Sequence, residues 1–161
     1  MQGRGVQPEA TYQIRLRPAR QLAGLLRRLF SILPDGGFIS CEGDLDEVGL
    51  TDQGLDESEH PEFTRQSQQL WPRRRGRDFL VLALTDHVKE EILRHVDETR
   101  DPIGVHLEVP CISIGGELAV QMFDMFDDIY VRKVVGEATL EAWRAEGLIK
   151  RWEQMPEQLS R

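Results

Sequence analysis

Three side chains that could ligate a metal recur at helical spacing: His87, Glu91 and His95. Residues four apart share one face of an α-helix, so adjacent members of this set could chelate a divalent cation. A zinc site needs about four ligands, and the sequence does not identify the others. The spacing suits a solvent-facing polar side of a helix equally well. Two interpretations therefore stand: a metal-binding or metal-dependent catalytic face, and a purely structural one.

The segment 42–59 is rich in carboxylates and contains no Lys or Arg. Counting an EF-hand loop from Asp44 puts Val48 and Leu55 at positions that require oxygen ligands, so the segment is not an EF-hand. It is either a solvated loop or a surface that attracts a basic protein by electrostatic steering. On the second interpretation the contacting carboxylates include Asp44, Asp46, Glu47 and Asp52.

Aromatic and acidic side chains are interleaved in a second group at 123–130. Large apolar side chains among carboxylates are typical of a hot-spot patch that faces a basic partner. A turn between two strands, with its aromatic side chains in the core, would have the same composition. On the first interpretation the partner-binding residues here are Asp124, Phe126, Asp127, Asp128 and Tyr130.

The sequence contains no GxSxG motif and no Walker A or GxGxxG loop. We therefore predict no catalytic residue and no cofactor. A short basic run beside Trp71 could contact phosphates, but pairing with the acidic segment of the same chain is the competing interpretation. The run consists of Arg73, Arg74, Arg75 and Arg77.

Alternating strands and helices would position these side chains. Apolar residues spaced three and four apart predict helices over 19–33, 86–96 and 137–146. Alternating or continuous apolar runs predict strands at 12–17, 38–41, 79–84, 105–109, 111–114, 117–123 and 129–135. The pattern predicts an α+β fold, a mixed, largely antiparallel sheet of about five or six strands with about three helices packed mainly on one face.

Local signals refine this prediction. The continuous apolar run at 79–84 predicts a central strand that is buried on both faces. Pro110 is expected to interrupt its strand because it cannot donate a backbone hydrogen bond. The Gly-Gly pair at 115–116 predicts a hairpin turn, with a helix starting near Glu117 as the alternative. Gly147 is expected to end the last helix.

The chain has 161 residues, a length that fits one domain. We assign 11–153 to a single α+β domain with a long irregular insertion at 43–77, a flexible lead-in at 1–10 and a C-terminal tail at 154–161. No apolar run is long enough to span a bilayer, and the N-terminal residues lack the apolar core of a signal peptide. We therefore expect a cytoplasmic protein without a membrane partner.

The formal net charge of -8 disfavours nucleic acid as a partner and favours a basic protein. Arginine greatly outnumbers lysine, which indicates a GC-rich, bacterial genome. Cys41 and Cys111 lie in apolar, strand-like segments without CxxC spacing, so we expect both to be buried thiols.

A small acidic α+β chain with a hairpin and the segment 125–130 resembles the bacterial immunity proteins that neutralise secreted polymorphic toxins. The resemblance implies a non-catalytic inhibitor that binds a cognate basic toxin domain in the cytoplasm and occludes its active site. The resemblance assigns no functional role to any individual residue, because it does not rest on a defined family motif. A third alternative is a structural or regulatory subunit that forms a homo-oligomer through the patch at 123–130.

Overall fold

The computed structural model describes residues 10–16, 22–43, 49–55, 65, 78–99, 107–123, 128–132 and 134–156. The described strands are β1 (Thr11–Arg15), β2 (Phe38–Gly43), β3 (Asp78–Ala83), β4 (Leu107–Ile114), β5 (Glu117–Phe123), β6 (Asp128–Arg132) and β7 (Arg151–Gln154). The described helices are α1 (Leu22–Ile32), the short 3-10 helix η2 (Thr51–Gln53), α3 (Asp86–Thr99) and α4 (Glu137–Ala145).

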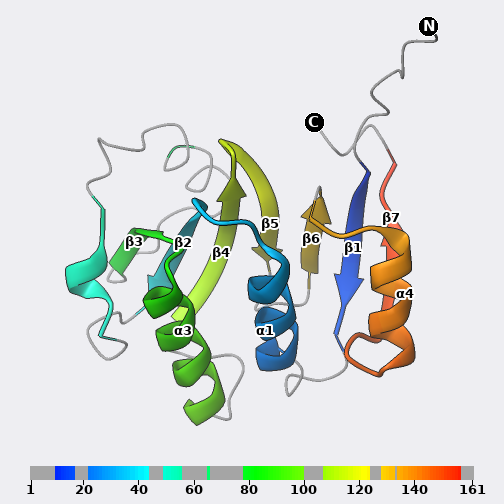
Figure 1. The fold of residues 1–161 in the computed structure, drawn as a ribbon, viewed down its shortest axis with the longest axis horizontal. Helices are drawn as coiled ribbons and strands as arrows, with labels where there is room; N and C mark the ends of the chain where they lie inside the picture. The colour runs from blue at the N-terminus through cyan, green and yellow to red at the C-terminus, as the bar shows by residue number, and fades with distance from the viewer. Residues whose placement is uncertain are drawn as a thin grey trace, which may run out of the picture.

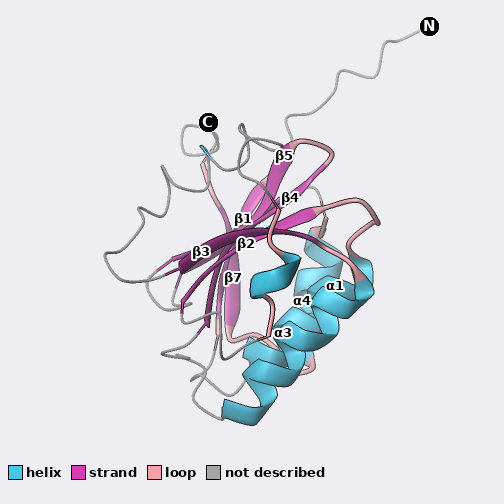
Figure 2. Ribbon diagram, turned by 90° about the vertical axis from the view of Figure 1, so that its left-hand side faces the viewer, coloured by secondary structure: helices cyan, strands magenta, loops and turns pink. Residues whose placement is uncertain are grey.

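The described strands form one seven-stranded sheet in the order β3-β2-β4-β5-β6-β1-β7, and each neighbouring pair is antiparallel (Figure 1). Helices α1, α3 and α4 lie side by side on one face of this sheet (Figure 2). The predicted α+β class and the helices on one face are therefore confirmed. The sheet has seven strands where about five or six were predicted: the segments 105–109 and 111–114 form the single strand β4, and β7 was not expected.

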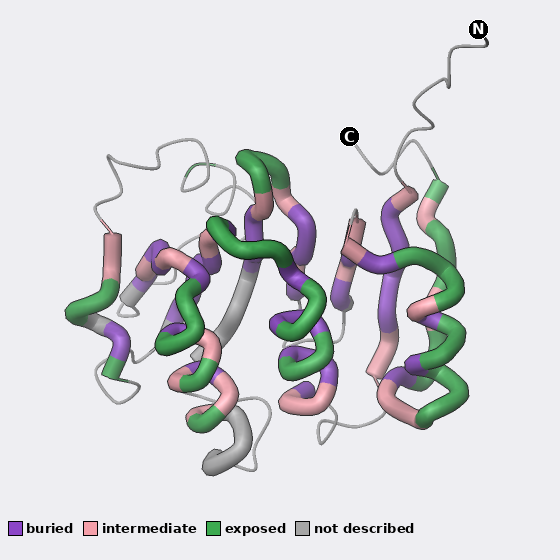
Figure 3. The backbone as a smooth tube through the Cα atoms, viewed as in Figure 1, coloured by how far each residue is buried: buried purple, intermediate pink, exposed green. Residues whose placement is uncertain are grey.

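The core lies between the helices and the sheet (Figure 3). Helix α1 buries a stripe of apolar residues at the spacing that predicted it: Leu22, Leu25, Leu26, Leu29 and Phe30. Helix α3 contributes Val88 and Ile92, and α4 contributes Leu140 and Trp143. None of the described helices is long and apolar enough to cross a membrane.

Two helix ends follow from local chemistry. The Thr85 side chain caps α3, because its Oγ1 accepts a hydrogen bond from the backbone N–H of Val88 at 3.2 Å. Gly147 ends the last helix as predicted, with a φ of 79° that favours glycine. The N–H groups of Gly147 and Leu148 donate to the carbonyls of Arg144 and Trp143, which closes the helix.

The strand predicted at the centre of the sheet is in fact its edge strand. β3 pairs only with β2 among the described strands. Burial on both faces is nevertheless confirmed, since Leu82 joins the helix-side core while Phe79 and Val81 form a second cluster on the opposite face. A continuous apolar run indicates that both faces of a strand are buried, but it does not indicate where the strand lies in the sheet. The predicted central position was wrong for this reason.

Pro110 does not interrupt its strand. β4 runs from Leu107 to Ile114, and the register with β2 shifts around the proline, where two residues of β4 lie opposite Cys41 alone. This β-bulge accommodates a residue that has no N–H to donate.

The Gly-Gly pair at 115–116 forms the predicted hairpin. Both glycines have positive φ, 60° and 81°, as a tight two-residue hairpin turn requires. Residues 117–123 are a strand, β5, so the helical alternative is wrong.

Candidate functional site

One row of side chains crosses all seven described strands on the face opposite the helices. Residues directly opposite each other in neighbouring strands share a face, so the register defines the row. From β7 to β3 this polar row consists of Glu153, Gln13, Tyr130, Gln121, Cys111, Ser40 and Val81. Its polar members come from five different segments of the chain, which only the sheet brings together.

The polar row has a closed end and an open end. At the closed end, over β3, β2 and β4, the residues Val81, Ser40 and Cys111 are at most 1% exposed and lie beside an apolar cluster. At the open end, over β5, β6, β1 and β7, Gln121 and Tyr130 are half-buried and Glu153 is exposed, whereas Gln13 is only 6% exposed. A partner can therefore reach the row at its open end.

Arginines flank the open end. On the same face Arg132 lies opposite Thr11, and Arg151 lies opposite Arg15. Arg15 and Arg132 are half-buried and Arg151 is exposed. Although the chain is acidic overall, the surroundings of Tyr130 in the described residues are therefore rich in guanidinium groups.

The structure corrects one assumption about the acidic segment. Glu42 belongs to β2 and is 0% exposed, opposite Phe79 of β3. A carboxylate in that position cannot contact a partner, so the acidic docking segment does not begin at residue 42.

The remaining predicted contacts are distributed unevenly. Asp52 is exposed in η2, beside β3, whereas Tyr130 lies on β6, beyond β2, β4 and β5. At about 4.8 Å per strand the two are roughly 19 Å apart, so the structure does not bring them together. Asp128 begins β6, opposite Phe123. The other predicted contacts lie outside the described residues: Asp44, Asp46, Glu47, Asp124, Phe126 and Asp127. The arginine run at 73–77 lies outside them as well.

The helix with metal-ligating spacing is α3, on the helical layer of the molecule. His87 is exposed, and Glu91 and His95 are half-buried. Glu91 forms an ion pair with Arg94, whose hydrogen bond is the main cause of a lowered pKa of the Glu91 carboxyl. Among the described residues no group of three or more His, Cys, Asp or Glu side chains is placed to hold a metal. The Glu91 carboxylate therefore pairs within its own helix.

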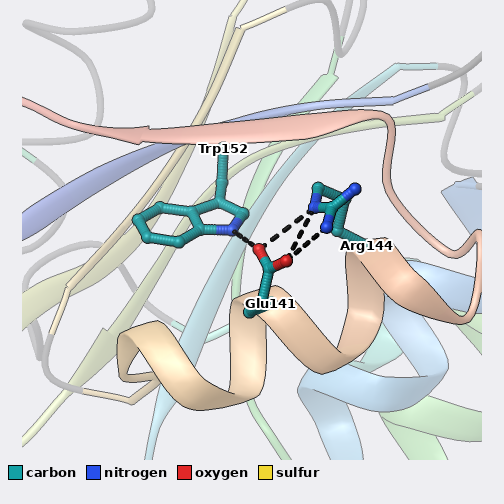
Figure 4. A network of polar contacts seen from close by, with 3 residues as sticks. All are labelled: Glu141, Arg144 and Trp152. Atoms are coloured by element: carbon teal, nitrogen blue, oxygen red, sulfur yellow. Dashed lines mark hydrogen bonds and ion pairs between the residues drawn. The ribbon is translucent and has the colours of Figure 1, made fainter.

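A polar network that the sequence did not reveal joins α4 to β7 (Figure 4). Glu141 accepts hydrogen bonds from Arg144 Nε at 3.0 Å and from Trp152 Nε1 at 3.1 Å. These bonds lower the pKa of Glu141 to about 2. The Trp152 ring also packs edge-on against Tyr12, with centroids 5.8 Å apart. The network fixes α4 directly over the last strand.

Both cysteines are buried free thiols, as predicted. They lie on opposite faces of the sheet, since Cys41 joins the helix-side core and Cys111 belongs to the polar row. Burial raises the pKa of the Cys41 thiol to about 12, which makes it a poor nucleophile.

Comparison with known proteins gives no match: no family model fits the sequence, and neither a curated protein nor a solved structure is significantly similar to it.

Proposed function

We propose that the protein is a non-catalytic inhibitor that binds another protein through the open end of the polar row. The observation that carries the proposal is the position of Tyr130, half-buried between Gln13 and Gln121 on the face that no described helix covers. In this proposal the protein acts as an immunity protein, and its partner is a bacterial toxin domain whose active site it occludes.

The chemistry of the open end supports this proposal. Tyrosine and arginine are the residue types that dominate binding energy at protein interfaces, because each offers a large contact area together with hydrogen-bonding groups. Gln13, Tyr130 and Arg132 sit on neighbouring antiparallel strands, so little ordering entropy is lost when a partner binds. The arginines favour carboxylates and carbonyl oxygens on the partner surface.

The carboxylates have a separate role in this proposal. With a formal net charge of -8, the protein attracts a basic partner over long range and so raises the rate of encounter. Among these carboxylates Asp52 is exposed beside the opposite edge of the sheet. The acidic residues thus steer, while the polar row specifies the contact.

A co-expression assay tests the proposal. The product of the gene adjacent to this one is expressed alone and together with the chain, and growth is measured. We expect the neighbour to be toxic alone, to be neutralised by the wild type, and to be neutralised less by Tyr130→Ala. Glu90→Ala, an exposed substitution on the helical side, is the matched control and should protect fully. A harmless neighbour that does not bind the chain would contradict the proposal.

A further inference from the structure

The two edges of the sheet differ in whether their backbone groups are already bonded. At the β3 edge the N–H of Leu55 donates to the carbonyl of Val81 at 2.8 Å. Leu50, five residues earlier, is 0% exposed in the helix-side core, and Leu55 packs against the apolar cluster on the other face. The segment 49–55 therefore covers the β3 edge and prevents another strand from pairing there.

The β7 edge has no such cover among the described residues. Met155 N–H donates to the Thr11 carbonyl at 2.8 Å, and the register places Glu153 opposite Gln13. Backbone groups alternate in direction along an antiparallel strand, so the N–H and C=O groups of Trp152 and Gln154 point away from β1. No hydrogen bond joins these groups to a described residue.

The side chains of β7 specify what an added strand should carry. Arg151 is exposed on β7, where it lies opposite Arg15 of β1. A carboxylate on an added strand beside Arg151 would form an attractive cross-strand pair with it. Glu153, two residues further along the same face, would pair with a basic residue.

Steric reasoning excludes a second copy of the chain as the occupant. Helix α4 lies over β7 (Figure 1), and the hydrogen bond from Trp152 to Glu141 holds it there. Edge-to-edge pairing of two β7 strands would place them about 4.8 Å apart, and their overlying helices would be separated by a similar distance. Packed helices need about 8–10 Å between their axes, so a bare strand fits this edge and a copy does not.

We propose that β7 is a docking edge for an extended segment of a protein partner, which adds to the sheet as an antiparallel strand. Read from its N-terminus, the docking segment carries a basic, an apolar and an acidic residue opposite Glu153, Trp152 and Arg151. The inference rests on the proposed function only in taking the partner to be a protein.

A synthetic peptide with the central sequence Thr-Lys-Val-Glu-Thr tests this edge in the intact chain. Titration followed by NMR should shift the backbone amide signals of Trp152 and Gln154 before those of other residues. The charge-reversed peptide Thr-Glu-Val-Lys-Thr should bind several-fold more weakly, because both cross-strand pairs become repulsive. Methylation of the valine nitrogen should abolish binding, because that N–H would donate to the Trp152 carbonyl.

A charge swap supplies the decisive variant. Arg151→Glu combined with Glu153→Arg keeps the net charge and should reverse the preference between the two peptides. Glu90→Arg on α3 is the control and should leave the preference unchanged. Absence of shifts at Trp152 and Gln154, or an unchanged preference in the swapped variant, would overturn the inference. Neither result bears on Tyr130, so the growth assay would still decide the proposed function.

Discussion

Two rows of residues cross the same seven strands one position apart, and they differ in character. The core row, on the helix side, consists of Gln154, Tyr12, Val131, Val120, Ile112, Ile39 and Leu82. All of its members except Gln154 on β7 are buried hydrophobic residues, and Tyr12 is the only one of them with a hydroxyl group. In the polar row, on the opposite face of the same strands, Tyr130 is the neighbour of Val131 and Gln121 is the neighbour of Val120.

This difference shows how one sheet separates stability from recognition. The face covered by helices must be apolar, because burying unpaired polar groups there would cost free energy. The opposite face can keep polar side chains where it is open, and it becomes apolar toward β3, where Val81 lies back to back with Leu82. Side chains at the open end of the polar row can therefore be substituted without disrupting the core.

The largest contrast is expected between neighbours on β2. Ile39 and Ser40 are both 0% exposed, one in each row. Ile39→Ala should lower the free energy of unfolding by about 2–5 kcal/mol, because it removes packed methyl groups and leaves a cavity. Ser40→Ala should maintain or raise it, by up to about 1–3 kcal/mol, since the buried Ser40 Oγ has no hydrogen-bond partner in the described part of the chain. Urea denaturation measures both, and equal losses would contradict the distinction between the rows.

The two cysteines test whether the closed end of the polar row is truly closed. Cys41 and Cys111 are both at most 1% exposed, so neither should react with a thiol reagent in the native state at neutral pH. Rapid labelling of Cys111 alone, followed by mass spectrometry, would show that the closed end is accessible.

The Cys41 thiol also predicts an alkaline effect. Its pKa is about 12 in the folded chain against an ordinary value of 9.0, so the unfolded chain loses its proton first. Stability contributed by the neutral thiol is therefore complete below pH 9.0 and is lost as pH rises toward 12. Cys41→Ala should remove this component from the pH dependence of unfolding, whereas Cys111→Ala should retain it.

The smallest effect is expected at the β7 end. Hydrogen bonds from Arg144 and Trp152 hold the pKa of Glu141 at about 2, below its ordinary 4.5. Their contribution to stability is therefore present above pH 4.5 and is lost as pH falls toward 2. Glu141→Gln should flatten the pH dependence of unfolding in that range, and Glu137→Gln on the same helix should not. Identical curves for the two variants would refute the network's role.

Much of the fold could be predicted because burial leaves a periodic signal. The leucine spacing of α1 and the Gly-Gly hairpin both depend on neighbours in sequence. Sheet order could not be predicted, since the placement of β3 at an edge depends on Leu55 and β2 rather than on its own residues. β7 was missed because Arg151–Gln154 is short and mostly exposed, with Trp152 as its one large apolar side chain.

The candidate site was predicted less completely. Tyr130 was singled out from its acidic neighbours, but its partners Gln13 and Gln121 come from β1 and β5 and become neighbours only in the folded sheet. The alternation of Tyr12 and Ile14 with Gln13 and Arg15 was the available signal for a polar outer face. Local spacing also predicts a metal face on α3, and there Glu91 pairs with Arg94.

The most direct test of the account is the dissociation constant of the complex with the neighbouring gene product, measured for wild type, Tyr130→Ala and the Glu90→Ala control. If the open end of the polar row is the contact surface, Tyr130→Ala should weaken binding by at least about 30-fold, the equivalent of about 2 kcal/mol. Glu90→Ala should bind like the wild type. Wild-type affinity in a folded Tyr130→Ala protein would contradict the account.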